Sequence, residues 1–391
     1  MSPRARWLRS SDVAAAAAAL TDLEEMLERR TVANERFFAA EAARIAELCH
    51  LLADRFLAGG RLLACGSSAQ DLSDARHVAV EFVHPVIVGK RALPALALAP
   101  AELELLADPA DAVIAFGPAE TLGVARSRGC LTIAFAPGDA EWVFEPATGD
   151  PFVDQELVES LYHMLWELVH VFFEHAGRAG RDGGASSFLY PFLSGARRDA
   201  AAVVADVQES VLMKAREVGA LRERTLRECR PALEAAARVL RERLADGGTL
   251  LACGNGGSAT DAMDVVADFR DAPQGWAARR CLDLTDDPAI LTALANDVGA
   301  AELYSRQLIA YGRPCDVALV LSTSGGSANV VKALVEARAR GLATIALVGY
   351  DGGRIAAEQL ADHVICVPSE HIPRIQEAQA SAYHALRELV G

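Results

Sequence analysis

The sequence predicts an α/β protein made of two similar domains, each a parallel sheet flanked by helices. Its 391 residues suit two domains, because most domains contain about 100–200 residues. An internal repeat divides the chain, and short apolar runs alternate with helical stretches in both halves. Hydrophobic residues make up 52% of the chain and charged residues 23%, which excludes a chain that is disordered throughout.

The repeat is clearest around one short apolar run. Residues 58–66 (AGGRLLACG) match residues 246–254 (DGGTLLACG) at seven of nine positions. After a slip of one residue, 74–82 matches 261–269, and later the Gln-Glu pair at 155–156 matches the pair at 376–377. We therefore predict a duplicated unit with a boundary near residue 190, in a linker rich in glycine and serine, giving domains 1–190 and 191–391.

The expected elements follow from hydrophobic pattern. Short, continuous apolar runs predict parallel strands buried on both faces, at Leu62–Cys65, Ala112–Phe116, Leu131–Phe135, Val317–Leu321 and Thr344–Val348. A long helical pair is expected to open each half, with the second pair at Ala200–Ala245. The polyalanine stretch Val13–Leu20 follows two serines and an aspartate, which indicates a helix rather than a signal peptide.

Charge and cysteine usage exclude several functions. The net charge of −15 argues against a nucleic acid partner, and no apolar run reaches the roughly 18 residues of a membrane span. The eight cysteines contain no C-x-x-C pair, so neither a cysteine-based zinc site nor a redox motif is expected. Their scatter favours a reduced, cytoplasmic location.

Two loops of the second half have the composition of a phosphate site. One follows an apolar run and contains Asn255, Gly256, Gly257 and Ser258; the other carries four hydroxyls, those of Ser322, Thr323, Ser324 and Ser327, directly before a predicted helix. Glycines let backbone N–H groups approach an anion at a helix N-terminus, and hydroxyls add further donors. The simpler interpretation is a helix cap with spare serines.

The second half resembles the phosphoheptose isomerases of the SIS (sugar isomerase) family along nearly its whole length. The matching segments are Cys253–Ser258, Ala295–Asp297, Ser322–Val330, Asp351–Gly353 and Arg374–Glu377. The resemblance implies two SIS-type domains packed as an internal pseudo-dimer and an aldose–ketose isomerase that converts sedoheptulose 7-phosphate to a manno-heptose 7-phosphate. It implies no nucleotide cofactor. It places the phosphate on the hydroxyl loop and the sugar against Asn255, Gly256, Gly257, Ser258, Asp297 and Gln376.

The family's catalytic residues are divided between the halves. The family carries a His and a Glu four residues apart, then a Gln and a His eight apart, and in several members these hold zinc. The first half has the full set, His77, Glu81, Gln155 and His163, whereas the second has Asp264, Asp268, Gln376 and His384. The first half lacks a hydroxyl loop, since Phe116-Gly117-Pro118-Ala119-Glu120 stands there. We expect zinc at the first-half set; the alternative is that these side chains are relics.

Two mechanisms and two function classes stay open. In a composite site, Glu81 is the base and His163 the acid for a sugar whose phosphate lies in the second-half loop; in the rival site, Asp268 and His384 take these roles. The alternative to an isomerase is a non-catalytic regulatory or scaffold protein that binds sugar phosphates. Two tandem chains are expected to pair as a homodimer.

Overall fold

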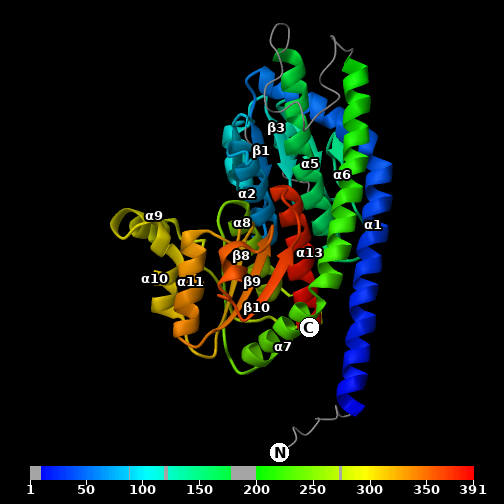
Figure 1. Ribbon diagram of the computed structural model, residues 1–391. Coiled ribbons are helices and arrows are strands. Elements are labelled where there is room, and N and C mark those ends of the chain that lie inside the picture. The colour runs from blue at the N-terminus through cyan, green and yellow to red at the C-terminus, as the bar shows by residue number, and fades with distance from the viewer. Residues whose placement is uncertain (1–9, 88, 119–121, 178–199, 273–274) are drawn as a thin grey trace, which may run out of the picture.

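The computed structural model describes residues 10–87, 89–118, 122–177, 200–272 and 275–391 (Figure 1). The first half consists of α1 (Ser10–Leu57), β1 (Leu62–Cys65), α2 (Ala69–Val83), β2 (Ala95–Leu98), α3 (Pro100–Leu106), β3 (Ala112–Ala115), α4 (Leu122–Ser127), β4 (Leu131–Ala134), β5 (Trp142–Val143) and α5 (Pro151–Gly177).

The second half consists of α6 (Ala200–Glu228), α7 (Arg230–Ala245), β6 (Leu250–Cys253), α8 (Gly257–Arg270), β7 (Cys281–Asp283), α9 (Pro288–Asp297), the short 3₁₀ turn η4 (Ala300–Glu302), α10 (Leu303–Tyr311), β8 (Val317–Ser322), α11 (Ala328–Ala339), β9 (Ala343–Gly349), α12 (Gly353–Ala357), β10 (His363–Val367) and α13 (Ile372–Val390).

Each half contains one five-stranded, parallel sheet, and the two sheets share one topology. Their orders are β2-β1-β3-β4-β5 and β7-β6-β8-β9-β10. Leu62 pairs with Ala112 as Leu250 pairs with Val317. The predicted fold class is confirmed, and each predicted strand lies in a sheet. The predicted boundary near residue 190 lies outside the described residues.

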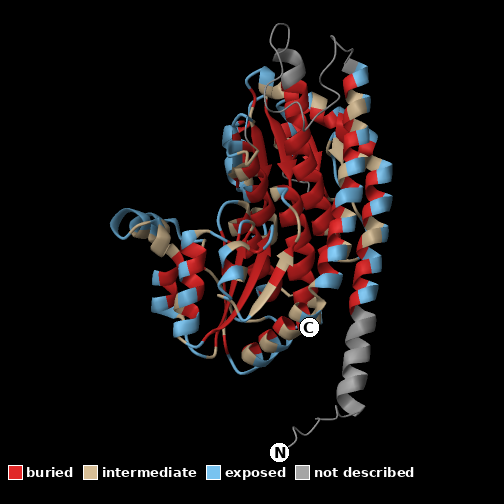
Figure 2. Ribbon diagram, viewed as in Figure 1, coloured by how far each residue is buried: buried red, intermediate tan, exposed pale blue. Residues whose placement is uncertain are grey.

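Alternate strand residues pack on opposite faces of each sheet. In the first half Leu62 and Ala64 contact the cluster that includes α1 and α5, whereas Leu63 and Cys65 pack with residues of α3 and α4. The strands are therefore buried on both faces, as their continuous hydrophobicity requires (Figure 2). No helix in the described ranges is long and apolar enough to cross a membrane. All eight cysteines are free thiols.

The expectation of a helical pair at the start of each half is wrong for the first half. There α1 runs unbroken from Ser10 to Leu57, because that stretch contains neither glycine nor proline. In the second half Pro231 stands in the first turn of α7 and separates it from α6, as expected of a residue that cannot continue a helix. The long helices α1 and α6 lie side by side along one flank of the molecule (Figure 1).

The halves meet through corresponding helices. The first-half helix α2 packs against α8, and α5 packs against α13. Each of these helices carries residues of the expected catalytic sets, so the contact between the halves brings both sets into one buried region.

Candidate active site between the two halves

The hydroxyl loop lies between β8 and α11. Ser327 is the N-cap residue of α11, yet its side chain makes no capping hydrogen bond. Its Oγ lies 3.5 Å from the Oγ of Ser322. Gly325 has φ 59°, and a Cβ there would collide with the carbonyl of Gly352, so the tight loop requires glycine. These hydroxyls are not used to cap the helix, and they suit a bound anion.

The glycine-rich loop is fastened to the hydroxyl loop by a pair of amides. Asn255 Nδ2 donates to Asn329 Oδ1 at 3.0 Å, and Asn329 Nδ2 donates to Asn255 Oδ1 at 2.8 Å. The hydroxyl of Tyr304 donates to the carbonyl oxygen of Gly254. The two loops therefore form one surface at the carboxyl ends of β6 and β8, where ligands of open α/β sheets bind.

At Gly257 this loop surface contacts the first half of the chain. A Cβ at Gly257 would lie 2.9 Å from His77 Nε2 and closer still to Gln376 Nε2. Only glycine permits so close an approach of the backbone. A side chain from the first half thus lies directly beneath a loop of the second half.

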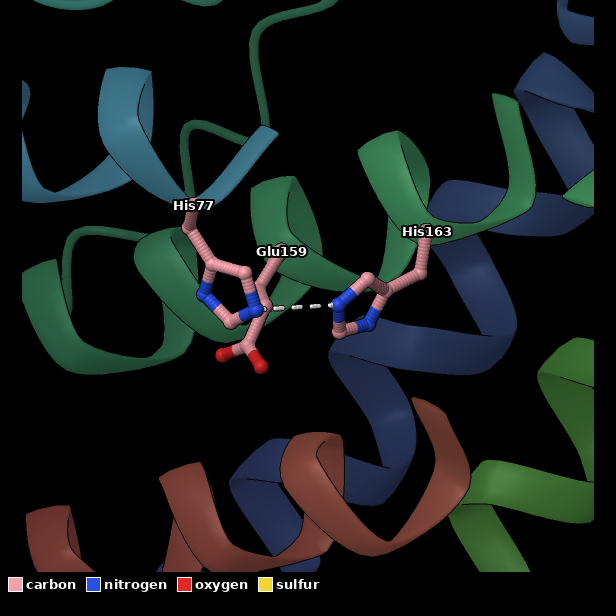
Figure 3. Close-up of side chains that lie close together, drawn as sticks. All are labelled: His77, Glu159 and His163. Atoms are coloured by element: carbon pink, nitrogen blue, oxygen red, sulfur yellow. Dashed lines mark hydrogen bonds between the residues drawn. The ribbon is translucent and has the colours of Figure 1, made fainter. Parts of the chain in front are cut away.

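Two histidines of the first half lie together at this point (Figure 3). His77 Nε2 is 3.3 Å from His163 Nε2 and 3.1 Å from Gln376 Nε2, and His163 Nδ1 is 3.1 Å from Glu377 Oε1. Burial lowers the pKa of both imidazoles, aided by the neighbouring His163 for His77 and by Arg374 for His163, whose pKa falls to about 3. Both rings are therefore neutral near pH 7.

A carboxylate that the sequence analysis did not assign completes the cluster. One ligand atom each from His77, Glu159 and His163 lies within 4.8 Å of the others, and Glu159 is 2% exposed. It stands four residues after Gln155 and four before His163, so the helical i, i+4 pattern was the available signal. The corresponding residue of the second half is Ala380, so this cluster has no counterpart there.

A second cluster surrounds His384. Its Nε2 lies 3.4 Å from Asp268 Oδ2 and 3.0 Å from Gln155 Oε1, and its Nδ1 lies 2.9 Å from Glu156 Oε1. Gln70 Nε2 donates to Gln155 Oε1 at 2.5 Å and approaches Asp268 Oδ1 at 3.4 Å. The rival base and acid are therefore in contact, together with two glutamines of the first half.

The expected zinc set is only partly brought together. His77 and His163 are neighbours, but Gln155 contacts His384, and the glutamine beside His77 is Gln376 from the other half. Glu81 is 2% exposed, and its Oε2 has no hydrogen-bond partner within the described part of the chain. Burial, with the nearby Glu167, raises its pKa to about 8.

The remaining predicted residues divide by exposure. Ser258, Ser322 and Gln376 are buried at the loop surface, Thr323 and Ser327 are half-buried, and Asn255 and Ser324 are exposed. Asp297 is exposed at the end of α9, where it accepts a hydrogen bond from Asn296; no hydrogen bond joins it to either loop in the ranges the structure describes.

Buried acids line the contact between α2, α5 and α8. Burial and mutual repulsion raise the pKa values of four carboxyls well above their usual range, those of Asp74, Glu159, Asp261 and Asp268. Burial raises the pKa of Asp264 to about 7. Such perturbed acids are typical of a functional site. By contrast, although burial opposes it, the charges of Arg30 and His384 hold the pKa of Glu156 below its usual value.

Known proteins match this chain in sequence and in fold. A family model described as SIS domain matches residues 215–349. The phosphoheptose isomerase of Thiobacillus denitrificans is 45% identical over 166 residues, which are 41% of this chain and 82% of that protein. The phosphoheptose isomerase of Rhodospirillum rubrum is 42% identical over 42% of this chain and 87% of its own length.

Several solved structures match nearly the whole chain, among them the following two. The C-terminal domain of glucosamine-fructose-6-phosphate aminotransferase from Francisella tularensis aligns over 94% of both chains with a TM-score of 0.60 and 10% identity. The tagatose-6-phosphate ketose/aldose isomerase from Escherichia coli aligns over 94% of this chain and 92% of its own with a TM-score of 0.54 and 13% identity. At these identities the likeness is one of fold, and it covers both halves.

Proposed function

Because this chain belongs to the SIS-domain family, with phosphoheptose isomerases among its relatives, we propose that it is a sugar-phosphate isomerase that interconverts sedoheptulose 7-phosphate and a manno-heptose 7-phosphate. The observation that carries the proposal is the contact at Gly257. The second half supplies the hydroxyl loop for the phosphate, and the first half supplies His77 and His163 directly beneath the adjoining loop. One composite site thus contains what neither half retains alone.

The isomerisation moves a proton between C1 and C2 of the sugar through an enediol. In the composite site Glu81 removes the proton from C1 of the ketose and returns it to C2, while neutral His163 passes the proton of the C1 hydroxyl to the oxygen at C2. Since the pKa of Glu81 is raised to about 8, the fraction in the basic form grows as the pH rises toward 8. We therefore expect turnover to increase between pH 6.5 and pH 8.

The histidine cluster also fits a zinc ion. Two ligands at about 2.0–2.1 Å from a tetrahedral zinc lie about 3.3–3.4 Å apart, and the two Nε2 atoms are separated by 3.3 Å. Both imidazoles are neutral, as ligation requires, and Gln376 Oε1 is a buried oxygen without a partner in the described chain. We propose His77, Glu159, His163 and Gln376 as the ligands. A zinc ion there would polarise a sugar oxygen in place of the proton transfer by His163, because a ligated Nε2 carries no proton and Nδ1 faces Glu377 Oε1 at 3.1 Å.

Parallel variants test the mechanism. The protein is incubated with sedoheptulose 7-phosphate, and the new aldose is followed by NMR. Loss of turnover in Glu81→Gln with retention in Asp268→Asn supports the composite site, and the reverse supports the rival pair. Full activity in both variants contradicts both mechanisms. Binding of the sugar phosphate without turnover in the unmodified protein supports the regulatory alternative.

Elemental analysis tests the zinc proposal independently of activity. The protein is purified without chelator and also reconstituted with zinc. We expect about one zinc per chain, lost in His77→Ala and kept in His384→Ala, the matched control from the other cluster. Absence of zinc from both preparations contradicts the site.

A further inference from the structure

Two glutamates that the proposed mechanism does not use each contact a histidine of the opposite half. Glu377 on α13 lies against His163 of α5, with its Oε1 3.1 Å from Nδ1. Glu156 on α5 lies against His384 of α13, with its Oε1 2.9 Å from Nδ1. All four side chains are buried. The Gln-Glu pairs of the repeat thus exchange their histidines across the contact between the halves.

The carboxyl group of Glu377 is fixed by further buried charges. Arg374 Nη1 lies 2.8 Å from its Oε2, and Arg374 Nη2 donates to Glu167 Oε1 at 2.5 Å. Although burial raises the pKa of Glu377 to about 7, the charge of Arg374 opposes this shift, so the carboxylate form predominates at pH 8. Since Oε2 faces the guanidinium, Oε1 is the atom that faces His163.

This arrangement decides which nitrogen of His163 carries the proton. A carboxylate oxygen only accepts hydrogen bonds, so Nδ1 of the neutral ring must be the N–H, and Nε2 keeps its lone pair. The opposite tautomer would set the lone pair of Nδ1 against Oε1 of Glu377. The Nε2 of His77 does not need a proton from His163, because the amide Nε2 of Gln376 lies 3.1 Å away and can donate to it.

We propose that Glu377 is a positioning residue that holds His163 as the Nδ1–H tautomer. The inference rests on the proposed function and deepens it, because the free Nε2 can accept the proton of the C1 hydroxyl and pass it to the oxygen at C2. A carboxylate at Nδ1 also stabilises the positive charge that the ring carries between these two steps. Ligation of a metal ion through Nε2 requires the same tautomer.

Glu377→Gln should reverse the tautomer at nearly constant shape. Arg374 only donates hydrogen bonds, so the amide must turn its oxygen toward the guanidinium and its NH₂ group toward His163. Nδ1 then accepts, and the proton of the ring moves to Nε2. Glu156→Gln is the matched control, because Glu156 occupies the equivalent place and is also paired with an arginine, Arg30. It should leave the tautomer of His163 unchanged.

Nitrogen NMR of protein with isotope-labelled histidines reads the tautomer directly. Spectra are recorded at pH 8 after chelator treatment, so that bound metal does not set the tautomer, and the signals of His163 are assigned by their loss in His163→Gln. We expect Nδ1–H in the unmodified protein and in Glu156→Gln, and Nε2–H in Glu377→Gln. The first of these measurements needs neither turnover nor a variant of Glu377 that folds. An Nε2–H in the unmodified protein, or an unchanged tautomer in Glu377→Gln, overturns the proposal.

Kinetics separate this role from a purely structural one. We expect Glu377→Gln to lower kcat for sedoheptulose 7-phosphate at least about 100-fold, the contribution of one positioned proton-transfer group, with KM little changed. Glu156→Gln should keep both constants. Absence of turnover in the unmodified protein contradicts the isomerase function, whereas the tautomer still decides the role of Glu377. The proposal is overturned if the tautomer reverses without loss of turnover, or if both variants lose turnover alike.

Discussion

Replacing Gly257 by alanine should disable the composite site without unfolding the protein. The added Cβ would lie 2.9 Å from His77 Nε2, whereas ordinary van der Waals contact begins at 3.4 Å, and it would lie closer still to Gln376. His77 must therefore move by about 0.5 Å and Gln376 by more. Because a misplacement of about 1 Å costs on the order of 100-fold in rate, we expect a loss of ten- to 100-fold in kcat.

Two readouts separate this effect from a general loss of structure. Turnover of sedoheptulose 7-phosphate reports on catalysis, and zinc stoichiometry reports on the histidine cluster without requiring activity. Gly123→Ala is the matched control, because a Cβ there has no atom within 4 Å; it should leave both readouts unchanged. The double variant that combines Gly257→Ala with Gln376→Ala removes the worse collision, so it should keep His77 closer to its place.

The outcome that refutes this reasoning is equally definite. If Gly257→Ala retains more than half of the turnover and its full zinc content, the glycine-rich loop does not approach the first-half histidines. The composite site then has no structural basis.

Three further perturbations test the buried charges and the assembly. Glu81→Gln should change how the free energy of unfolding depends on pH. Because the pKa of Glu81 is raised from 4.5 to about 8, the stabilisation from Glu81 is complete below pH 4.5 and is lost as the pH rises to 8, by up to about 1.4 kcal/mol per pH unit. Urea denaturation from pH 5 to 8 should show the variant gaining stability over the parent as the pH rises, and parallel profiles would contradict this. Arg374→Met should cost about 1.5–3 kcal/mol, because it removes a buried hydrogen bond to Glu167, which keeps its ion pair with Lys214. Arg354→Met, which breaks an exposed pair, should cost less than about 1 kcal/mol. Equal losses in urea denaturation would show that burial does not matter here. No residue of α9 is buried within one chain, so we expect this helix to contact the second chain of the proposed homodimer. Leu294→Asp should therefore give the mass of a single 41.5 kDa chain in light scattering. A monomeric parent would contradict the proposed assembly.

The fold could be predicted because it depends on local patterns. Apolar runs such as Leu62–Cys65 and Val317–Leu321 predicted the strands, and the repeat required both sheets to share one topology. The unbroken α1 was also within reach, since no glycine or proline lies between Ser10 and Leu57; the assumption that both halves begin alike concealed it. Here the repeat was a poorer guide than the residues themselves.

The site could be predicted only in part, because it forms between the halves. The resemblance to the family placed His77 and His163 in one site, and their Nε2 atoms lie 3.3 Å apart, but no spacing along the chain shows which glutamine faces them. The repeat makes Gln155 and Gln376 equivalent, and the packing of α5 against α13 exchanges them. Glu159 was missed although its i, i+4 relation to His163 was visible, because the resemblance directed attention to the family's own four positions.

The clusters around His77 and His384 differ because Gly257 stands beside the first and Gln70 stands at the comparable place beside the second. Gly257 leaves no side chain between its loop and Gln376, so that the cluster around His77 adjoins the hydroxyl loop. Gln70 takes the comparable place against Gln155, and its amide lies between that glutamine and Asp268. The rival acid–base pair is thus already engaged by the chain's own side chains, and Asp71 fills the adjoining anion site. The same duplication therefore leaves one cluster beside a loop suited to phosphate and the other beside a loop whose backbone N–H groups already bind the carboxylate of Asp71.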